Sequence, residues 1–173
     1  MTTTILKSDG TFYTDANGRQ TLKRELDARE SYTYTPTESV SGNYYPINSH
    51  LFIRDPLGKH QATVLVDRSQ GGSSLDGGLI ELMVHRRLLH DDSFGVDEPL
   101  DETAFNRGLV IRGKHYLILS DGPSSARRFR PLAQQLYKRP HISFIPTTLQ
   151  FGEWKNLFKT RVKYYFINLS FCN

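Results

Sequence analysis

The chain has 173 residues, of which 38% are hydrophobic, so it is long and apolar enough to form one domain with a core. Its formal net charge of +4 is too small an excess to indicate nucleic-acid binding by itself. A single cysteine, Cys172, excludes an internal disulfide framework and a cysteine zinc site.

The N-terminal part of the chain predicts antiparallel strands joined by tight turns. Residues 8–10 predict the turn of one hairpin, and Asn17-Gly18 is a strong signal for a second. The charged segment 19–27 would suit a helix by propensity, but the turn before it favours a strand. Residues 31–40, rich in Thr, Tyr and Ser, predict an extended loop or a sheet edge.

The middle of the chain predicts the strands of the main sheet. Residues 42–55 and 61–67 carry aromatic and β-branched side chains and are expected to be neighbouring antiparallel strands, joined by a turn at 55–58. Glycines and serines at 71–78 predict a sharp turn. The apolar run 79–89 then predicts one long strand, which two aspartates bring to an end.

Beyond this run, residues 91–102 predict a solvated loop, because six of the twelve side chains are carboxylates. Strand character resumes at 109–119, where Gly113 is expected to make a bend or bulge. A further strand is predicted at 141–146.

Residues 124–138 predict a short helical insertion in an otherwise β-rich chain. Ser124 and Ser125 are expected to cap its N-terminus. Pro131 is a candidate to begin a second short helix, because a proline at the first helical position loses no hydrogen bond. Pro140 is expected to end the helix.

Neither a membrane span nor a secretory signal is predicted from the sequence. No apolar run approaches the ~20 residues that a span requires. The first residues lack the basic region and the apolar region of a signal peptide. These features therefore do not assign the chain to a cellular compartment.

Three stretches carry a resemblance to a known family: FYTDANGR at 12–19, GNYYPINSHLFIRD at 42–55 and QGGSSLDGGLIELMVHRRLLHDD at 70–92. In this order they resemble the C-terminal β-rich half of class II α-mannosidases of lysosomal type, which form glycoside hydrolase family 38. The resemblance covers residues 5–145. One departure is Phe94, where the family usually has arginine, so a polar contact made from that loop is expected to be missing.

The resemblance implies an all-β fold, an antiparallel β-sandwich of the galactose mutarotase-like type with the helical insertion near 124–138. Residues 1–150 would be part of that β-domain, and residues 151–173 a tail of uncertain origin that could be an edge strand. The family consists of zinc-dependent retaining enzymes that remove terminal mannose from glycoproteins, here in the lysosome. Their nucleophile, acid and zinc ligands lie in an N-terminal domain that no stretch of this chain resembles. We therefore expect no catalytic residue and no metal site in this chain, and we expect the missing catalytic domain as its partner.

Eight side chains are candidates for contact with substrate or with that domain: Arg68, Gln70, Ser73, Ser74, Arg86, Arg87, Asp91 and Asp92. One of the adjacent arginines is expected to face inward or into an interface, where it needs a carboxylate partner; two solvated arginines are the equal alternative. The adjacent aspartates point apart, so they do not suit the carboxylate pair about 5 Å apart that a retaining glycosidase needs.

Three other features have a simple interpretation. His85 and His90 are separated by an odd number of residues, which places them on opposite faces of a strand and argues against a shared metal ion. The basic group at 127–139 has few interleaved aromatics and no nucleic-acid motif, so a solvated helix face is favoured. Asn168 begins a glycosylation acceptor pattern, which matters only if the chain enters the secretory route.

Two other functions stay open from the sequence. A stand-alone carbohydrate-binding sandwich would stack sugars on exposed aromatics such as Tyr44, Tyr45 or Trp154. An interaction subunit would pair with a separately made catalytic chain. Mannose-containing glycans are the expected ligands, and neither nucleic acid nor a membrane is an expected partner.

Overall fold

The computed structural model describes residues 6–95, 97–137, 142, 144, 146 and 148–157. The chain divides into two units, Met1–Arg139 and Pro140–Asn173. In the second unit, helix α2 (Phe151–Leu157) is exposed along its whole length. The sheets and helix α1 all belong to the first unit.

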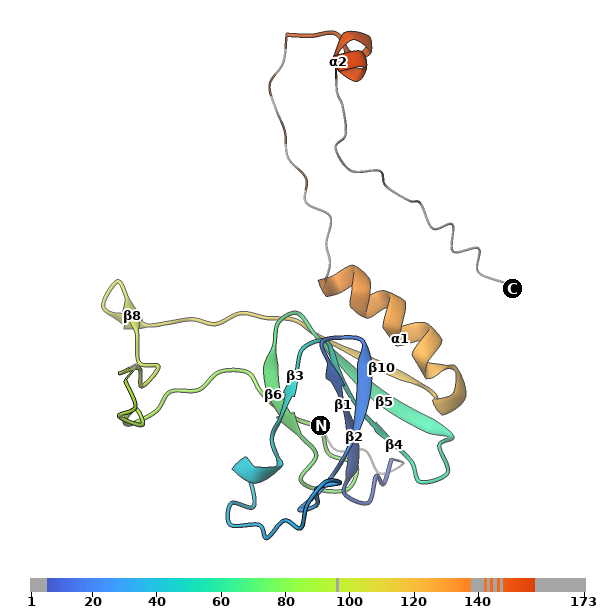
Figure 1. Cartoon of the computed structure of the whole chain (residues 1–173), viewed down its shortest axis with the longest axis vertical. Helices are drawn as coiled ribbons and strands as arrows, with labels where there is room; N and C mark the ends of the chain where they lie inside the picture. The colour runs from blue at the N-terminus through green and yellow to red at the C-terminus, as the bar shows by residue number, and fades with distance from the viewer. Residues whose placement is uncertain are drawn as a thin grey trace. The chain divides into compact units, whose positions relative to one another are not determined.

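The larger sheet of the first unit has five antiparallel strands (Figure 1). In spatial order they are β10 (His115–Asp121), β5 (His60–Val66), β4 (His50–Arg54), β1 (Thr11–Ala16) and β2 (Gln20–Glu25). The predicted neighbours in the middle of the chain are β4 and β5, paired as Phe52 with Thr63 and Ile53 with Ala62. That prediction is confirmed.

Two smaller sheets complete the β-structure of the described residues. The first has the order β3 (Tyr45–Ile47), β6 (Gln70–Ser73) and β7 (Glu81–Met83), and a 3-10 turn at Ser41–Asn43 leads into it. The second is the short hairpin of β8 (Thr103–Ala104) and β9 (Arg107–Gly108). All of these pairings are antiparallel.

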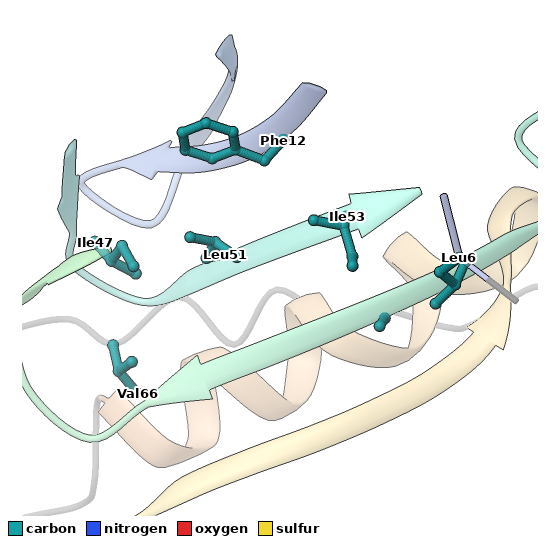
Figure 2. Close-up of a cluster of buried hydrophobic side chains, with 7 residues drawn as sticks. Leu6, Phe12, Ile47, Leu51, Ile53 and Val66 are labelled. Atoms are coloured by element: carbon teal, nitrogen blue, oxygen red, sulfur yellow. The ribbon is translucent and has the colours of Figure 1, made fainter. Parts of the chain in front are cut away.

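The hydrophobic core lies on one face of the five-stranded sheet (Figure 2). Its buried members are Leu6, Phe12, Ile47, Leu51, Ile53, Ala62 and Val66. Tyr45, Ile80 and Leu82 pack against them from the three-stranded sheet and its approach. Because side chains alternate along a strand, Leu51 and Ile53 of β4 share this face. Two sheets therefore enclose one core, as expected for a sandwich.

Helix α1 (Gly122–Tyr137) covers the opposite face of the larger sheet (Figure 1). Its buried residues Ser125, Phe129 and Ala133 recur every four positions, which puts them on one side of a helix. Phe129 and Ala133 pack on Phe52 and Leu65 of β4 and β5. An all-β sandwich with one helical insertion is thus confirmed.

Several local predictions near the N-terminus hold. Asn17 and Gly18 have φ of 53° and 70° and join β1 to β2, which confirms both the hairpin and the charged strand at 20–25. A turn forms at residues 8–10, but the described residue Leu6 lies in no strand, so that hairpin is not formed there. Residues 31–40 form no strand, as the loop alternative predicts.

The glycine–serine segment forms the predicted sharp turn only in its second half, where the Leu79 backbone N–H donates to the Asp76 carbonyl oxygen at 3.1 Å. Gln70–Ser73 forms strand β6, the middle strand of its sheet. A Cβ at Gly72 would overlap the Ile47 side chain and lie 3.1 Å from the Leu51 Cδ1 atom. The glycine is therefore needed for close packing between strands. Gly78, with φ of 81°, is the position in this segment that requires positive φ.

The two long strands predicted from apolar runs are both shorter than expected. Of residues 79–89 only Glu81–Met83 is a strand, and its three residues pair with Ser73, Gly72 and Gly71 of β6. Of residues 109–119 only the part from His115 is a strand. Gly113 precedes that strand instead of bending it, and the Arg68 guanidinium lies against it.

The helix also differs from its prediction in two ways. Asp121 caps it instead of the serines: its carboxylate accepts the Ser124 backbone N–H at 3.0 Å and the Ser124 hydroxyl at 2.6 Å. Pro131 lies inside a continuous helix and starts no second one. Burial of Phe129 and Ala133 on both sides of it holds the helix together against the lost backbone hydrogen bond.

Two predictions fall wholly or mainly outside the described residues. The strand at 141–146 is one of them. In the tail, residues 151–157 form a helix instead of the edge strand that was considered, and residues 158–173, with Asn168, are not described.

Candidate functional site

A long exposed segment joins β7 to β10. We call residues 84–114 the arm. Figure 1 shows its hairpin, β8–β9, away from both sheets. The described part of the arm exposes a series of large hydrophobic side chains: Val84, Leu88, Leu89, Phe94, Phe105, Leu109, Val110 and Ile111.

Three of these side chains are almost completely open to solvent. Leu89, Phe94 and Phe105 are 92%, 90% and 99% exposed. Single exposed hydrophobic residues are ordinary, but a run of them on one projecting segment marks an interaction surface. The arm is therefore the best candidate for contact with another domain.

Polar contacts hold the C-terminal end of the arm against the sandwich. Arg68 Nη1 donates to the Arg112 carbonyl oxygen at 2.8 Å. The Asp67 carboxylate accepts the Lys114 backbone N–H at 2.8 Å. The Gln70 amide oxygen lies 2.8 Å from His115 Nε2. The predicted site residues Arg68 and Gln70 thus position the arm where it returns to the sheet.

The same contacts leave three buried polar atoms without a partner among the described residues: Asp67 Oδ1, Arg68 Nη2 and Gln70 Nε2. Buried donors and acceptors are normally satisfied. At the C-terminal end of the arm, these three atoms can therefore still form hydrogen bonds.

The serines of the glycine–serine segment face inward. Ser73 and Ser74 are fully buried. The Ser73 hydroxyl donates to the Asn43 carbonyl oxygen at 2.8 Å, and the Ser74 hydroxyl to the Asp76 carbonyl oxygen at 3.2 Å. Both hydroxyls hold connecting segments of the sandwich in place. Because both side chains are buried, neither is accessible to a ligand in this conformation.

The other four predicted residues lie on the arm. Arg86 and Arg87 are both exposed, and the described residues contain no ion pair to either. Asp92 accepts the Phe94 backbone N–H at 3.1 Å, which fixes a local turn. Asp91 is half-buried. These arm residues differ from Ser73 and Ser74 in their surroundings. The two serines are buried in the core, whereas the arm residues lie at the surface.

A second apolar surface lies beside the three-stranded sheet. That sheet leaves the edge strand β10 uncovered, so Leu117 and Leu119 are exposed although their neighbours Val64 and Ala62 are buried. They line a cavity of about 320 Å³, which we call the β10 groove. Its lining is Ile53, Ala62, Val64, Gly78, Ile80, Leu82, His115, Leu117 and Leu119. Like the arm, this groove lacks a covering layer.

Sequence reasoning missed a buried polar cluster around Asp15. One oxygen of this carboxylate accepts the backbone N–H groups of Asn48, Ser49 and His50 at 2.9, 2.9 and 3.1 Å. The other accepts the Gly18 N–H at 2.6 Å. An aspartate just before Asn-Gly signals a turn, but nothing local signals that it also holds a segment more than thirty residues away.

His50 belongs to the same cluster. Its Nδ1 lies 2.8 Å from the Ser49 hydroxyl oxygen and its Nε2 lies 3.2 Å from the Thr21 hydroxyl oxygen. The ring packs on Phe129, with centroids 4.6 Å apart. Burial lowers the pKa of His50, Asp15 opposes this, and Arg130 adds to it. The imidazole is therefore held neutral as a structural group.

The aromatics considered for sugar stacking are engaged elsewhere. The Tyr44 hydroxyl donates to the Glu81 carboxylate, and burial followed by this hydrogen bond raises the pKa of Tyr44 to about 12. The guanidinium of Arg24 covers the Tyr45 ring at 4.3 Å. Trp154 stacks on Phe151 within α2.

The described residues contain no group of three histidine, cysteine, aspartate or glutamate side chains that could hold a metal ion. Over the same part of the chain, no helix combines the length and the hydropathy needed to cross a bilayer. Of the basic group, Arg127, Arg128 and Arg130 are exposed on α1, and Arg130 donates to the Arg19 carbonyl oxygen at 2.9 Å.

Comparison with known proteins gives a consistent result. Residues 2–94 match the model of the glycosyl hydrolases family 38 C-terminal domain. Over 139 residues the chain is 52% identical to lysosomal alpha-mannosidase of Mus musculus, which covers 80% of this chain and 13% of that protein. Lysosomal alpha-mannosidase of Homo sapiens is 48% identical over 143 residues, which cover 83% of this chain and 14% of that protein.

An alpha-mannosidase of Arabidopsis thaliana is 42% identical over 162 residues, covering 91% of this chain and 16% of the relative. A match this long extends past residue 150 into the tail. The chain therefore spans about one seventh of the length of the curated relatives that it matches.

Proposed function

This chain belongs to glycosyl hydrolase family 38, through the C-terminal domain of that family, and we propose that it is the supporting, non-catalytic β-domain of an α-mannosidase. In this proposal, the whole protein hydrolyses terminal α-D-mannose in the breakdown of glycoproteins, and it works in the lysosome. The chemistry is carried out by a catalytic domain outside these residues, and the sandwich holds that domain in place.

The observation that carries the proposal is the apolar arm. Leu89, Phe94 and Phe105 have no core of their own to pack into. Exposing them costs the chain the favourable free energy of burying apolar surface, roughly 25 cal/mol per Å². A second domain that covers the arm and the β10 groove removes this cost. Such a domain is consistent with relatives about seven times as long.

Zinc does not fit the residues described here. Zinc in proteins is held by several nitrogen, sulfur or carboxylate ligands at one point. Across the described ranges no such group converges, and His85 and His90 stand exposed on the arm. Under the proposal the zinc and the two carboxyl groups of a retaining glycosidase belong to the catalytic domain.

The proposed sites are the arm side chains Arg86, Arg87, Asp91 and Asp92, which are free to meet that domain. Arg68 and Gln70 contribute indirectly, because they hold the C-terminal end of the arm against the sandwich. Phe94 adds an apolar contact where a polar one would otherwise be expected.

A chimera tests the arm. Residues of this chain replace the matching segment of the mouse relative, and Leu89→Ser and Phe105→Ser are introduced on the arm. Leu57→Ser is the matched control, since Leu57 is also largely exposed, at 79%, but lies in the turn at 55–58. We expect the arm variants to lower the thermal midpoint and the mannosidase activity of the chimera, and the control to change neither. Arm variants that behave like the control contradict the proposal.

A further inference from the structure

A separate polar cavity lies between helix α1 and the turns at one end of the larger sheet. Its volume is about 420 Å³, within the range of small-molecule sites. We call it the α1 pocket, and its lining is Asn17, Gly18, Arg19, Asn48, Ser49, Ser69, Ala133, Gln134 and Tyr137. None of these residues was a candidate site residue from the sequence, although Asn17 and Gly18 were noted as a turn, and none belongs to the arm or the β10 groove.

The hydrogen-bonding side chains of the lining are neutral except for Arg19, and none is a carboxylate. Three amide side chains and two serine hydroxyls supply both donors and acceptors, and Arg19 supplies the one cation of the lining. This set suits a ligand with many hydroxyl groups. It does not suit a metal ion, which requires anionic oxygens or soft ligands.

The polar groups that the turns contribute to the pocket are fixed before any ligand arrives. The Ser69 hydroxyl donates to Asn48 Oδ1 at 3.0 Å, and Asn48 Nδ2 donates to Asn17 Oδ1 at 3.4 Å. The backbone of Asn48 and Ser49 is held by the buried Asp15 carboxylate. Preorganised polar groups lose little entropy on binding.

An aromatic ring stands at the side of this polar set. Tyr137, on the last turn of α1, is 48% exposed, and within the described residues its hydroxyl makes no hydrogen bond. The face of an aromatic ring is electronegative and attracts the C–H groups on one side of a pyranose. Ala133, one helical turn before Tyr137, also lines the pocket.

We propose that the α1 pocket binds one neutral hexopyranose unit, with Tyr137 stacking on the ring and Asn17, Asn48 and Gln134 bonding its hydroxyls. The site is a glycan contact made by the sandwich itself. It would hold a neighbouring sugar of a branched substrate. The inference does not depend on the arm, so the pocket can bind or fail to bind whatever the chimera shows.

The test is an NMR titration of the 15N-labelled chain with methyl α-D-mannopyranoside. We expect saturable shifts at Gly18, Asn48, Ser69 and the end of α1. Tyr137→Ala and Gln134→Ala should each weaken the affinity about tenfold. Gln135→Ala is the matched control, because Gln135 is the exposed neighbour that does not line the pocket; its affinity should stay within about twofold.

Three results overturn the proposal: shifts that do not saturate, shifts that map elsewhere, and equal effects of Gln134→Ala and Gln135→Ala. A fourth is saturation of the same resonances by inorganic phosphate but not by the mannoside, which would make Arg19 part of an anion site. If the isolated chain is not folded, equilibrium dialysis on the chimera decides instead. One mannoside site must then disappear with Tyr137→Ala and remain with Gln135→Ala.

Discussion

Replacing Asp15 should destabilise the sandwich more than replacing any exposed acidic residue. Its carboxylate is 3% exposed and accepts four backbone N–H groups, three of them from the consecutive residues Asn48, Ser49 and His50. Hydrogen bonds to a charged acceptor contribute about 1.5–3 kcal/mol each, but bonds to one shared group do not add fully. We therefore expect Asp15→Ala to cost about 3–5 kcal/mol of unfolding free energy.

Asp15→Asn separates the two halves of this interaction. The amide keeps an oxygen for the three consecutive N–H groups, but its NH₂ faces the Gly18 N–H, donor to donor. A loss of about 1–2 kcal/mol is expected. Asp92→Ala, which removes one exposed bond to Phe94, is the control and should stay within about 0.5 kcal/mol.

Urea unfolding followed by circular dichroism measures all three variants, with the slope of each transition compared as well as its midpoint. The expected order of loss is Asp15→Ala, then Asp15→Asn, then Asp92→Ala. An Asp15→Ala variant within about 1 kcal/mol of the parent would refute the reasoning, because the buried N–H groups would then be satisfied in another way.

Three further predictions follow from the core and its edges. Gly72→Ala should lower the free energy of unfolding in urea by about 1–3 kcal/mol, because the added Cβ meets buried Ile47. Gly108→Ala is the control and should leave that free energy unchanged, because the space around Gly108 is open. Equal effects of the two substitutions would contradict the packing argument. Since burial lowers the pKa of His50, the unfolded state takes up the proton first, so stability should fall as pH drops below about 6.5. His50→Gln should flatten that slope in unfolding measured from pH 7.5 to 5, and an unchanged slope counts against it. Asp121→Ala should lower the helical circular dichroism signal and the thermal midpoint, because the Asp121 carboxylate caps α1 through the Ser124 hydroxyl and backbone N–H. The same two hydrogen bonds hold the pKa of Asp121 low. Glu98→Ala on the arm is the control, and equal losses in the two variants would exclude the cap.

The strands of the main sheet could be predicted from local sequence because their signals agree with their environment. β4 and β5 are rich in β-branched and aromatic residues and are buried on both faces. Asn17-Gly18 adopts the positive φ values that its residue types favour. At these positions propensity, pattern and burial all favour the same structure.

The first half of the glycine–serine segment was mispredicted because the reason for its glycines lies in another strand. Gly71 and Gly72 look like turn residues in isolation, but Gly72 is required by the closeness of Ile47, which comes from β3. The apolar run 79–89 was mispredicted for the opposite reason. Beyond Met83 its hydrophobic side chains, Val84, Leu88 and Leu89, are exposed, so hydrophobic pattern alone overstated the strand.

The candidate sites divide in the same way. Arg86, Arg87, Asp91 and Asp92 could be noted from the sequence, since they follow an apolar run directly. The α1 pocket could not, because Asn17, Asn48 and Tyr137 come from three distant segments that only the fold brings together. The structural role of Asp15 depends on the same long-range contact.

The most direct test of the central claim compares the isolated 173-residue chain with the chimera in the mouse relative, using p-nitrophenyl α-D-mannopyranoside in the presence of zinc. The account predicts that the chimera releases p-nitrophenol and that the isolated chain does not. Zinc-dependent release by the isolated chain, or a folded chimera without activity, would contradict it.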